Sequence, residues 1–598
     1  MKVKNVYEEM RRLFRFIVYI LLPLAGGGWV GVSCSDFLYD ESDQVMYADD
    51  HQLASDADTL WAMAGIMNKM QAIADRTILL GEVRGDLVDL TAQASSHLRQ
   101  IALFNVSDTN KYNRPRDYYA IINNCNYFLA NADTALRNNR GEYIFRKEYA
   151  AVKAFRAWTY LQLALNYGRV PFITEPILSM DDSEKQYDLY DIGQVCNYFI
   201  SDIAPYADIE MPAYNTIRNT DSRLFYFPIR LLMGDLYLWS GQYREAAQSY
   251  YQYLATRNGQ NSAYPISTSS VRFSRTDTHW TNTTDSWMTS SFQDEKYTSN
   301  GELITMIPGD SIPAEGNYSE LRDLFNTNEN NEYKESITPS QSIIDLSAAQ
   351  RYCHYTTGGE FVYPPASGLE ANKRGDLRLQ AVYSSSDNMN IVVNGKRIKN
   401  YATVSKYATR NVHLYRRSMV YLRLAEALNR AGYPRMAFQI LKRGLNNNVI
   451  EQQVVPFYPP KDAAFLRSFR FPNTLYVLET TSQQSNENTM GLHAHGCGFA
   501  ANDTTYVMPD DATIADSLTR QQYQIEQVED LIMDEEALEF AFEGHRFYDL
   551  MRVALRRNDP SYLARRVYQR RGTAQEGTMH SLIQADLTDT RNWYLPLK

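Results

Sequence analysis

Cysteine is scarce in this chain, with five in 598 residues. Four of the five are far apart in the sequence, which excludes a disulfide-rich scaffold and favours buried free thiols. An excess of positive charge is also missing, because 60 basic and 70 acidic residues give a net charge of −10. That balance disfavours a nucleic-acid partner. The four scattered cysteines are Cys125, Cys196, Cys353 and Cys497.

The sequence motifs of common catalytic sites are absent as well. The chain contains no His-Glu-x-x-His, no Gly-x-Ser-x-Gly, no phosphate loop and no dinucleotide fingerprint. His493, His495 and Cys497 alternate with other residues and place three metal-capable side chains close together. Without a second cluster of ligands this spacing is a weak zinc signal. We therefore predict no metal and no cofactor.

Long apolar runs are missing too, and the one near the start is short. A basic leader precedes the apolar residues 16–25, which are too few to span a bilayer. Small residues at 31–33 come directly before Cys34. We predict a lipoprotein signal peptide over residues 1–33 and lipidation of Cys34, which would anchor the protein in a membrane without spanning it. An ordinary secretory signal cut nearby is the alternative.

Among the features that are present, the stretch from Met533 to Arg552 is the most informative. Its apolar residues recur at helical spacing, so we predict one long helix over about 531–556. Acids crowd its start and bases its end, as the helix dipole prefers. Gly544 lies inside this pattern, where glycine costs about 0.5–1 kcal/mol relative to alanine. Its presence predicts the close approach of another backbone.

Charged residues follow one face of the same predicted helix at spacings of three or four. We interpret them as a solvated ladder whose pairs contribute about 0.2–0.5 kcal/mol each. A catalytic role for Glu543, His545 and Asp549 is the alternative. The ladder consists of Glu539, Glu543, Arg546, Asp549 and Arg552.

An internal repeat predicts two similar helical hairpins. Small and large residues recur at the same offsets in two places, and a glycine falls between the two helices of each. This is the pattern of a tetratricopeptide hairpin, which needs neighbours because each hairpin exposes an apolar side. The first hairpin carries Gly234, Tyr237, Gly241, Ala246 and Tyr250, and the second carries Ala425, Leu428, Gly432, Ala437 and Leu441.

Several separate blocks of the sequence resemble the SusD/RagB family. Residues 538–552, Leu-Glu-Phe-Ala-Phe-Glu-Gly-His-Arg-Phe-Tyr-Asp-Leu-Met-Arg, strongly resemble the C-terminal signature of that family. The resemblance runs from Cys34 to about Arg552. The other blocks are 34–38, 82–86, 118–129, 155–171, 337–345, 375–378, 405–407 and 421–427, and residues 593–596 look like the closing strand of the family.

This resemblance implies a mainly α SusD-like fold with tetratricopeptide-type hairpins. We expect one domain over residues 34–598, with a helical scaffold at about 50–257 and 405–557 and a loop-rich ligand-binding insert at about 258–404. Members of the family are surface lipoproteins of the Bacteroidetes outer membrane that capture nutrients for a SusC-like TonB-dependent transporter. The resemblance therefore implies a binding protein without catalytic activity.

The expected ligand is an oligosaccharide, because sugar rings stack on aromatic side chains while their hydroxyls need polar partners. In the family the ligand surface comes from early loops and the insert, here about 82–115 and 265–335. A peptide, as bound by RagB-like relatives, is the main alternative, and a hydrolase or a protein-binding tetratricopeptide adaptor is less favoured. Our predicted ligand-binding residues are Trp280, Trp287 and Tyr318 for stacking, and Arg84, Asp86 and Asn113 as polar partners.

Overall fold

The computed structural model divides the chain into two compact units, residues 1–52 and residues 53–598, and only the second contains described residues. The predicted signal peptide and Cys34 therefore lie outside the described residues. No helix in the described part of the chain is long and apolar enough to cross a membrane. The description covers residues 56–217, 219–255, 302–309, 318–327, 334–356, 358–365, 375–386, 401–471, 491–499, 506–570 and 583–597, with short stretches at 257–295 and 391–398.

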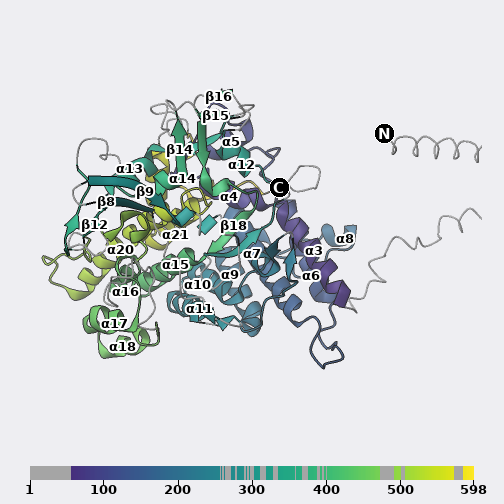
Figure 1. Ribbon diagram of the computed structural model, residues 1–598. Helices are drawn as coiled ribbons and strands as arrows, with labels where there is room; N and C mark the ends of the chain where they lie inside the picture. The colour runs from purple at the N-terminus through teal and green to yellow at the C-terminus, as the bar shows by residue number, and fades with distance from the viewer. Residues whose placement is uncertain are drawn as a thin grey trace, which may run out of the picture. The chain divides into compact units, whose positions relative to one another are not determined.

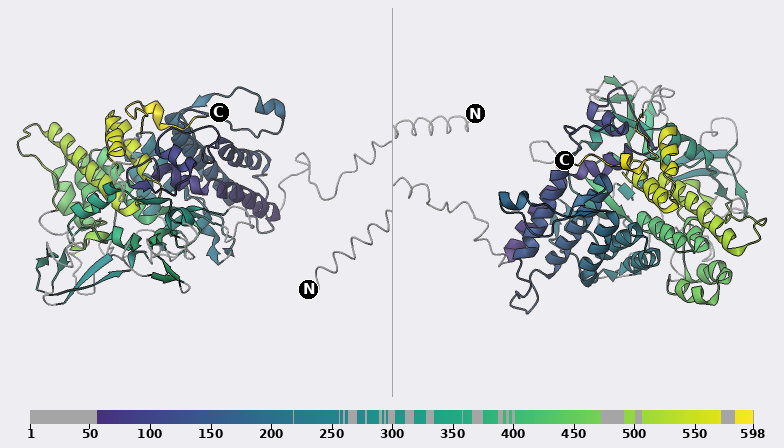
Figure 2. Two further views of the ribbon diagram at one scale, coloured as in Figure 1. Left: turned by 90° about the horizontal axis from the view of Figure 1, so that it is seen from above. Right: turned by 180° about the vertical axis from the view of Figure 1, so that it is seen from behind.

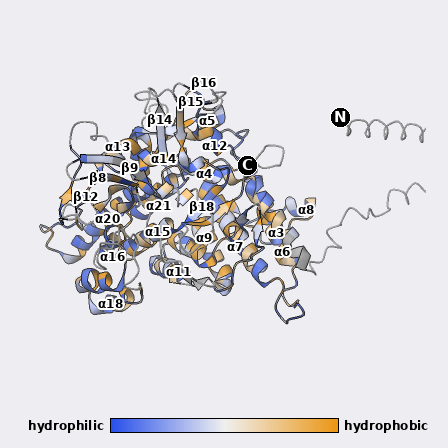
Figure 3. Ribbon diagram, in the orientation of Figure 1, coloured by the Kyte–Doolittle hydropathy of each residue, from blue (hydrophilic) through white to orange (hydrophobic). Residues whose placement is uncertain are grey.

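Helices build most of the second unit, and many of them pack on the next helix along the chain (Figure 1). In sequence order, α6 packs on α7, α7 on α9, α9 on α10, and α11 on α15, which also contacts α20. Single helices carry both hydrophobic and hydrophilic residues along their length (Figure 3), as expected when one face is buried. These helices are α3 (Asp56–Gln71), α4 (Ala74–Glu82), α6 (Pro115–Asn131), α7 (Arg146–Tyr167), α9 (Ile192–Ile203), α10 (Ile229–Trp239), α11 (Tyr243–Ala255), α15 (Arg417–Arg430), α16 (Pro434–Lys442), α20 (Ser517–Phe540), α21 (Arg546–Arg557) and α22 (Ser561–Gln569).

Both predicted tetratricopeptide hairpins are confirmed, as α10 with α11 and as α15 with α16. Gly234 and Tyr250 make the small–large contact of the first hairpin, because a Cβ on Gly234 would lie 2.4 Å from the Tyr250 ring. The interhelical glycines Gly241 and Gly432 have φ angles of +78° and +96°, which favour glycine. The helices α3 and α6 lie on the side of this unit away from α20 (Figures 1 and 2).

The strands form short antiparallel pairs between the helical parts. One such pair joins residues 391–393 and 396–398, where Val393 lies opposite Lys396. The predicted closing strand at 593–596 is wrong, because the buried Trp593 ends a 3₁₀ turn and the backbone N–H of Leu595 donates to the carbonyl of Asn166 at 2.8 Å. The pairs used below are β2 (Val170–Pro171) with β3 (Leu189–Tyr190), β8 (Val271–Thr276) with β9 (His279–Asp285), and β10 (Leu303–Ile307) with β18 (Val412–Arg416).

The prediction of one long helix over 531–556 is wrong, because the chain turns between α20 and α21. Phe542 and Gly544 have φ angles of +72° and +80°, outside the helical range. The Glu82 carboxylate accepts hydrogen bonds from the backbone N–H groups of both residues, each at 2.9 Å. The turn is thus held by a residue that lies 460 positions earlier in the chain.

The predicted close approach at Gly544 is confirmed. A Cβ added to Gly544 would lie 2.5 Å from the Cα of Ile78 and from the carbonyl oxygen of Thr77. A Cβ on Gly81 would lie 1.7 Å from the carbonyl oxygen of Gly544. The turn after α20 and the helix α4 therefore touch backbone to backbone, which explains the glycine in the C-terminal stretch.

The interpretation of a solvated charge ladder is also wrong, since all five of its members are buried. Most of their partners come from distant parts of the chain, although Asp549 also binds Arg552 within the ladder. Arg416 binds Glu539 at 2.7 Å and Glu543 at 2.8 Å, and Lys406 binds Glu543 at 2.5 Å. Because buried charges must be paired, the residues form what we call the buried ion network.

Arg378 is the centre of this network. Its guanidinium binds Asp376 at 2.7 Å, Glu535 at 2.7 Å and Glu539 at 2.8 Å, and none of its side chain is exposed. Burial alone would raise the pKa of Glu535, but Arg378 and His493 beside it hold that pKa at about 2. The carboxylate is therefore charged at neutral pH and binds the central arginine firmly.

Two further pairs complete the buried ion network around α21. Arg546 binds Asp86 at 2.6 Å, and Arg552 binds Glu426 at 2.6 Å. Asp86, Asp376, Lys406 and Glu426 each belong to a block that resembles the family in sequence. Those blocks therefore meet in space, where they hold the fold together.

Candidate ligand-binding site

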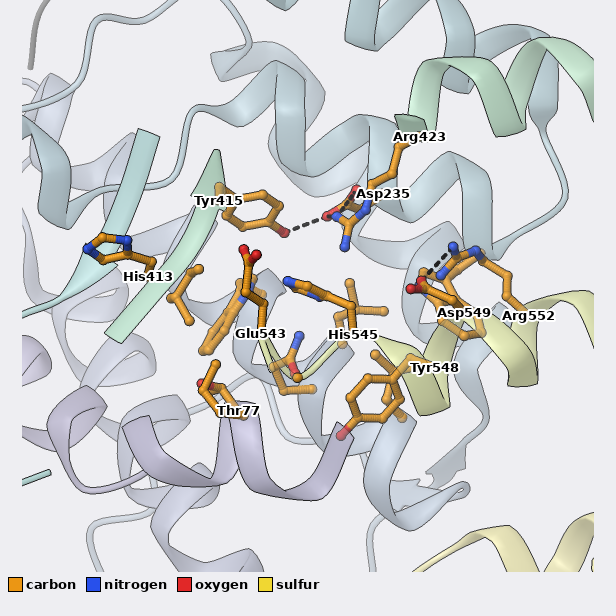
Figure 4. A pocket seen from close by; sticks show the side chains of 18 residues that line it. Thr77, Asp235, His413, Tyr415, Arg423, Glu543, His545, Tyr548, Asp549 and Arg552 are labelled. Atoms are coloured by element: carbon orange, nitrogen blue, oxygen red, sulfur yellow. Dashed lines mark hydrogen bonds and ion pairs between the residues drawn. The ribbon is translucent and has the colours of Figure 1, made fainter. Parts of the chain in front are cut away.

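A small cavity lies beside the turn between α20 and α21 (Figure 4). Asp235 accepts hydrogen bonds there from Tyr250 at 2.6 Å, Tyr415 at 2.5 Å and Arg423 at 2.6 Å. Burial and the nearby Arg423 lower the pKa of His545 to about 3, so its imidazole is neutral. The free volume is about 50 Å³, which holds a few water molecules and no sugar ring.

Two of the three residues considered for catalysis, Glu543 and Asp549, are bound in ion pairs around this cavity. Glu543 binds Lys406 and Arg416, and Asp549 binds Arg552 at 2.8 Å. His545 is neutral and enclosed. The three side chains thus belong to the interior of the scaffold.

A larger cavity of about 380 Å³ is the candidate ligand-binding site, and we call it the Tyr318 cleft. It joins the start of α4, the loop before α6, the end of β10 and the residues after 317. The early loop and the insert, which the family resemblance assigned to the ligand surface, therefore meet here. The lining residues are Gln71, Ala72, Ala74, Asp75, Arg76, Lys111, Tyr112, Arg114, Asp117, Pro308, Gly309, Tyr318, Ser319, Glu320 and Val412.

Opposite charges in the Tyr318 cleft are paired with each other. Arg76 binds Asp117 at 2.5 Å, and Lys111 binds Glu320 at 2.6 Å. Arg114 lies 4.0 Å from Asp117. With three basic and three acidic lining residues, the walls are polar and carry little net charge. Such walls offer many donors and acceptors to an uncharged polar ligand.

Hydrogen bonds fix the insert against the helical scaffold at this cleft. The Asp75 carboxylate accepts from the Ser319 hydroxyl at 2.7 Å and from the backbone N–H of Glu320 at 2.8 Å. On the other side, the Gln71 amide donates to the carbonyl of Pro308 at 2.7 Å. Both walls are therefore held in place without a ligand.

Two tyrosines give the cleft its aromatic surface. The guanidinium carbon of Arg410 lies 3.6 Å from the ring centroid of Tyr318, and Arg410 also donates to the carbonyl of Ser319 at 2.6 Å. The cation–π contact with Arg410 thus holds the half-buried Tyr318 ring in a fixed orientation. Tyr112 is buried, and its hydroxyl makes no hydrogen bond of good geometry among the described residues, although the Glu320 carboxylate lies near it. A ligand hydroxyl that reached Tyr112 would satisfy this group.

Of the six predicted ligand residues, only Tyr318 lines this cleft. Asn113 lies next to it in sequence, but its side chain is buried and donates to the carbonyl of Pro596 at 3.2 Å. Trp280 is in β9, half-buried, with its ring stacked on Phe273 at 4.8 Å. The structure therefore places Trp280 apart from Tyr318.

The remaining three predicted residues are buried in the scaffold. Trp287 has no exposed surface, and stacking on its ring would require the covering side chains to move. Arg84 donates to the Asn166 side chain at 2.6 Å, and Asp86 binds Arg546. No bound ligand tests any of the six, so their ligand-binding role stays a prediction.

Sequence reasoning missed most of the residues that line the cleft. Lys111, Tyr112 and Arg114 lie within the early loop that the resemblance indicated, just before a proline that begins α6. That polar, aromatic run before a helix start was a usable signal. Asp75 and Arg76 lie inside α4, where nothing in the local sequence distinguishes them from surface charges.

The weak zinc signal at 493–497 lies against the buried ion network. His493 is 2.8 Å from Glu535, His495 is 3.0 Å from Glu539, and the Cys497 thiol donates to Asp376 at 3.3 Å. All three contact acids that also bind Arg378, so a guanidinium occupies the centre of the cluster. Within the described part of the chain, no group of His, Cys, Asp and Glu residues could hold a metal ion.

Comparisons with known proteins agree with this architecture. The family model described as the SusD family matches residues 451–598. No curated protein matches the chain. A SusD superfamily protein from Bacteroides vulgatus ATCC 8482 aligns with a TM-score of 0.54 at 14% identity, over 90% of this chain and 95% of that chain.

Two further solved structures are similar at comparable levels. A SusD superfamily protein from Bacteroides thetaiotaomicron VPI-5482 has a TM-score of 0.53 at 14% identity, over 90% of this chain and 96% of that chain. A SusD-like carbohydrate binding protein from Bacteroides fragilis NCTC 9343 has a TM-score of 0.51 at 11% identity, over 84% and 86%. At these identities the structural likeness establishes the fold, and the predicted SusD-like fold is confirmed.

Proposed function

We propose that this chain, which belongs to the SusD family, is a non-catalytic surface lipoprotein that binds an extracellular oligosaccharide and delivers it to a SusC-like TonB-dependent transporter. Lipidation of Cys34 would hold it at the cell outer membrane. The proposal treats residues 34–598 as one domain, in which the insert at about 258–404 supplies part of the ligand surface. Carbohydrate binding by the relative from Bacteroides fragilis supports a sugar as the ligand.

The observation that carries the proposal is the Tyr318 cleft. It brings an aromatic ring, a buried tyrosine hydroxyl and paired charges to one cavity of about 380 Å³. A sugar places its C–H face on an aromatic ring and its hydroxyls on such polar groups. The internally paired charges favour a neutral sugar over a charged one.

The first experiment screens the purified protein on a glycan array and, in parallel, against a peptide library. We expect binding to a neutral oligosaccharide. Binding to peptides alone would support a RagB-like peptide carrier and contradict the oligosaccharide. Release of products from a bound polymer would indicate a hydrolase, and a stable complex with another protein and no small ligand would indicate an adaptor.

A matched pair of variants then locates the site. Tyr318→Ala removes the ring that Arg410 orients, and we expect the affinity for the glycan to fall by about tenfold, near the contribution of one stacked ring. Tyr143→Ala is the control, because Arg137 covers the Tyr143 ring at 3.9 Å in the same manner outside the cleft. Equal losses in both variants, or no loss in Tyr318→Ala, would place the ligand elsewhere.

A further inference from the structure

We propose that a second pocket, separate from the Tyr318 cleft, binds an apolar side chain of another protein that is flanked by basic residues. The pocket has a volume of about 270 Å³ and lies between α6 and the segment that follows α7. It shares no lining residue with the Tyr318 cleft. This inference stands independently of the proposed function. The lining residues are Tyr119, Ile122, Asn123, Asn126, Pro171, Ile173, Ile177, Ser183, Lys185 and Tyr187.

The surface of this pocket is mostly apolar. Ile122 on α6 lines it, and Ile173 and Ile177 contribute from the segment after α7. The polar groups nearby are already used, because Tyr119 donates to the carbonyl of Pro171 at 2.9 Å and Tyr187 donates to that of Asp182 at 2.8 Å. An apolar group entering the pocket would therefore displace water without breaking protein hydrogen bonds.

Two asparagines hold the pocket open in a fixed shape. The Asn123 side chain donates to the carbonyl of Ile177 at 3.0 Å and accepts from its N–H at 2.7 Å. Asn126 donates to the carbonyls of Ile173 and Glu175, both at 3.1 Å. These bonds attach the segment after β2 to α6, as expected for amides within a helix. A preformed pocket binds without a large ordering cost.

Residues 175–191 line one side of the pocket through Ile177, Ser183, Lys185 and Tyr187, and this segment, which we call the rim, is strongly acidic. Residues 175–191 contain six acidic residues and one basic residue, Lys185. Lys185 is itself neutralised, because it lies 2.6 Å from Asp182. The remaining acids would attract lysine and arginine side chains on either side of an apolar anchor. The six acids are Glu175, Asp181, Asp182, Glu184, Asp188 and Asp191.

Exposed apolar residues lie in the same segment of residues 175–191. Met180 is 75% exposed, Leu178 is 58% exposed and Leu189 in β3 is 44% exposed. Apolar side chains that gather beside an apolar pocket and an acidic rim have the composition of a protein-docking surface, with an apolar centre and a charged edge. A small apolar ligand would need neither these exposed side chains nor the acidic rim.

The test follows the isoleucine methyl groups of the purified protein by NMR during titration with the peptide acetyl-Arg-Lys-Phe-Lys-Arg-amide. We expect shifts at Ile122, Ile173 and Ile177, and an affinity at least tenfold above that for acetyl-Glu-Asp-Phe-Asp-Glu-amide. The affinity should fall as salt is raised, since the rim charges are exposed. An acidic or uncharged peptide that binds as tightly would contradict the proposal, as would an absence of shifts.

Two sets of variants sharpen the test. Ser183→Phe fills the pocket and should lower the affinity for the basic peptide at least tenfold, whereas Ser201→Phe on α9, which is also exposed, should leave it unchanged. The double variant Asp181→Asn/Glu184→Gln keeps the pocket and should lower the affinity about threefold with a weaker salt dependence. Unchanged affinity for the basic peptide in both Ser183→Phe and the double variant would overturn the proposal. A dimer of the protein, seen in sedimentation and abolished by Ser183→Phe, would overturn it as well.

Discussion

The buried ion network and the Tyr318 cleft are built from the same kinds of residue but differ in what those residues do. Arg378, Glu535 and Glu539 are fully enclosed and bind one another. Lys111 and Glu320 in the cleft form a pair of the same length, yet their side chains are 42% and 47% exposed. Charge pairing alone therefore does not indicate function; burial decides whether a pair holds the fold or faces a ligand.

The difference between these two regions also explains which residues the family resemblance covers. The blocks that resemble the family meet in the buried ion network, where removing one partner leaves a buried charge alone. The residues of the Tyr318 cleft lie mostly outside those blocks. The resemblance thus identifies the fold, and the ligand has to be inferred from the geometry of the cleft.

The largest expected effect is on stability, at the centre of the network. Arg378→Met removes the arginine that binds Asp376 and Glu535 and leaves Glu539 with Arg416, and it should lower the free energy of unfolding by about 3–5 kcal/mol. Arg467→Met is the matched control, because it removes an exposed pair with Glu451 and should leave the free energy of unfolding nearly unchanged. Urea denaturation measures both, and similar losses would remove the distinction between the two regions.

The backbone contact at Gly544 gives the next effect. Gly544→Ala places a Cβ against Ile78 at a positive φ and should destabilise the protein by about 2–5 kcal/mol, through strain and overpacking. Gly65→Ala lies in α3, where nothing is within 4 Å of a new Cβ, and should stabilise by about 0.5–1 kcal/mol. Thermal unfolding distinguishes them, and a neutral Gly544→Ala would contradict the close approach.

The third effect depends on pH and concerns Glu82, which holds the turn after α20. Burial raises its pKa from the ordinary 4.5 to about 7, although the N–H groups of Phe542 and Gly544 oppose the shift. An acid whose folded pKa is raised contributes most below its unfolded pKa, and the contribution falls as pH rises toward the folded pKa. The free energy of unfolding should therefore lose about 3 kcal/mol from Glu82 between pH 4.5 and 7.

Two variants test whether Glu82 causes this decline of the free energy of unfolding with pH. Glu82→Gln should flatten the decline, with part of it remaining because burial also raises the pKa of Asp534 to about 6. Glu451→Gln should leave it unchanged, since Arg467 lowers the pKa of Glu451 and moves its titration below this window. Urea denaturation at several pH values gives the slopes, and an unaltered slope in Glu82→Gln would assign the decline to other groups.

The smallest effect on stability belongs to the cleft. Lys111→Met breaks the exposed pair with Glu320 and should change the free energy of unfolding by less than about 1 kcal/mol. The same variant should weaken binding of the glycan found on the array by several-fold, as measured by titration calorimetry. A large loss of stability with unchanged binding would give Lys111 the structural role assigned to the network.

The sequence predicted the parts of the fold that depend on neighbours along the chain. The offsets of Gly234 and Tyr250 were sufficient for the helical hairpins, because the two residues touch within one hairpin. The turn at Phe542 could not be predicted, since its hydrogen-bond acceptor is Glu82. The burial of the charged face could not be predicted either, because its partners, among them Arg378, are far away in sequence.

The ligand site was harder to predict from the sequence than the fold. Tyr318 was identified from the composition of the insert and lies in the cleft, whereas Trp287 was identified on the same grounds and is fully buried. Composition alone does not separate an aromatic residue that faces a cavity from one that packs in the core. Arg76 and Asp75 gave no local signal, because they line the cleft from within a helix.

The most direct test of the account is a crystal structure of the protein with the oligosaccharide found on the array. The account predicts the sugar in the Tyr318 cleft, with a ring face on Tyr318 and a hydroxyl bonded to the Tyr112 hydroxyl, and an unchanged buried ion network. A sugar bound outside the cleft, for example against Trp280, or a network rearranged by the ligand, would contradict it.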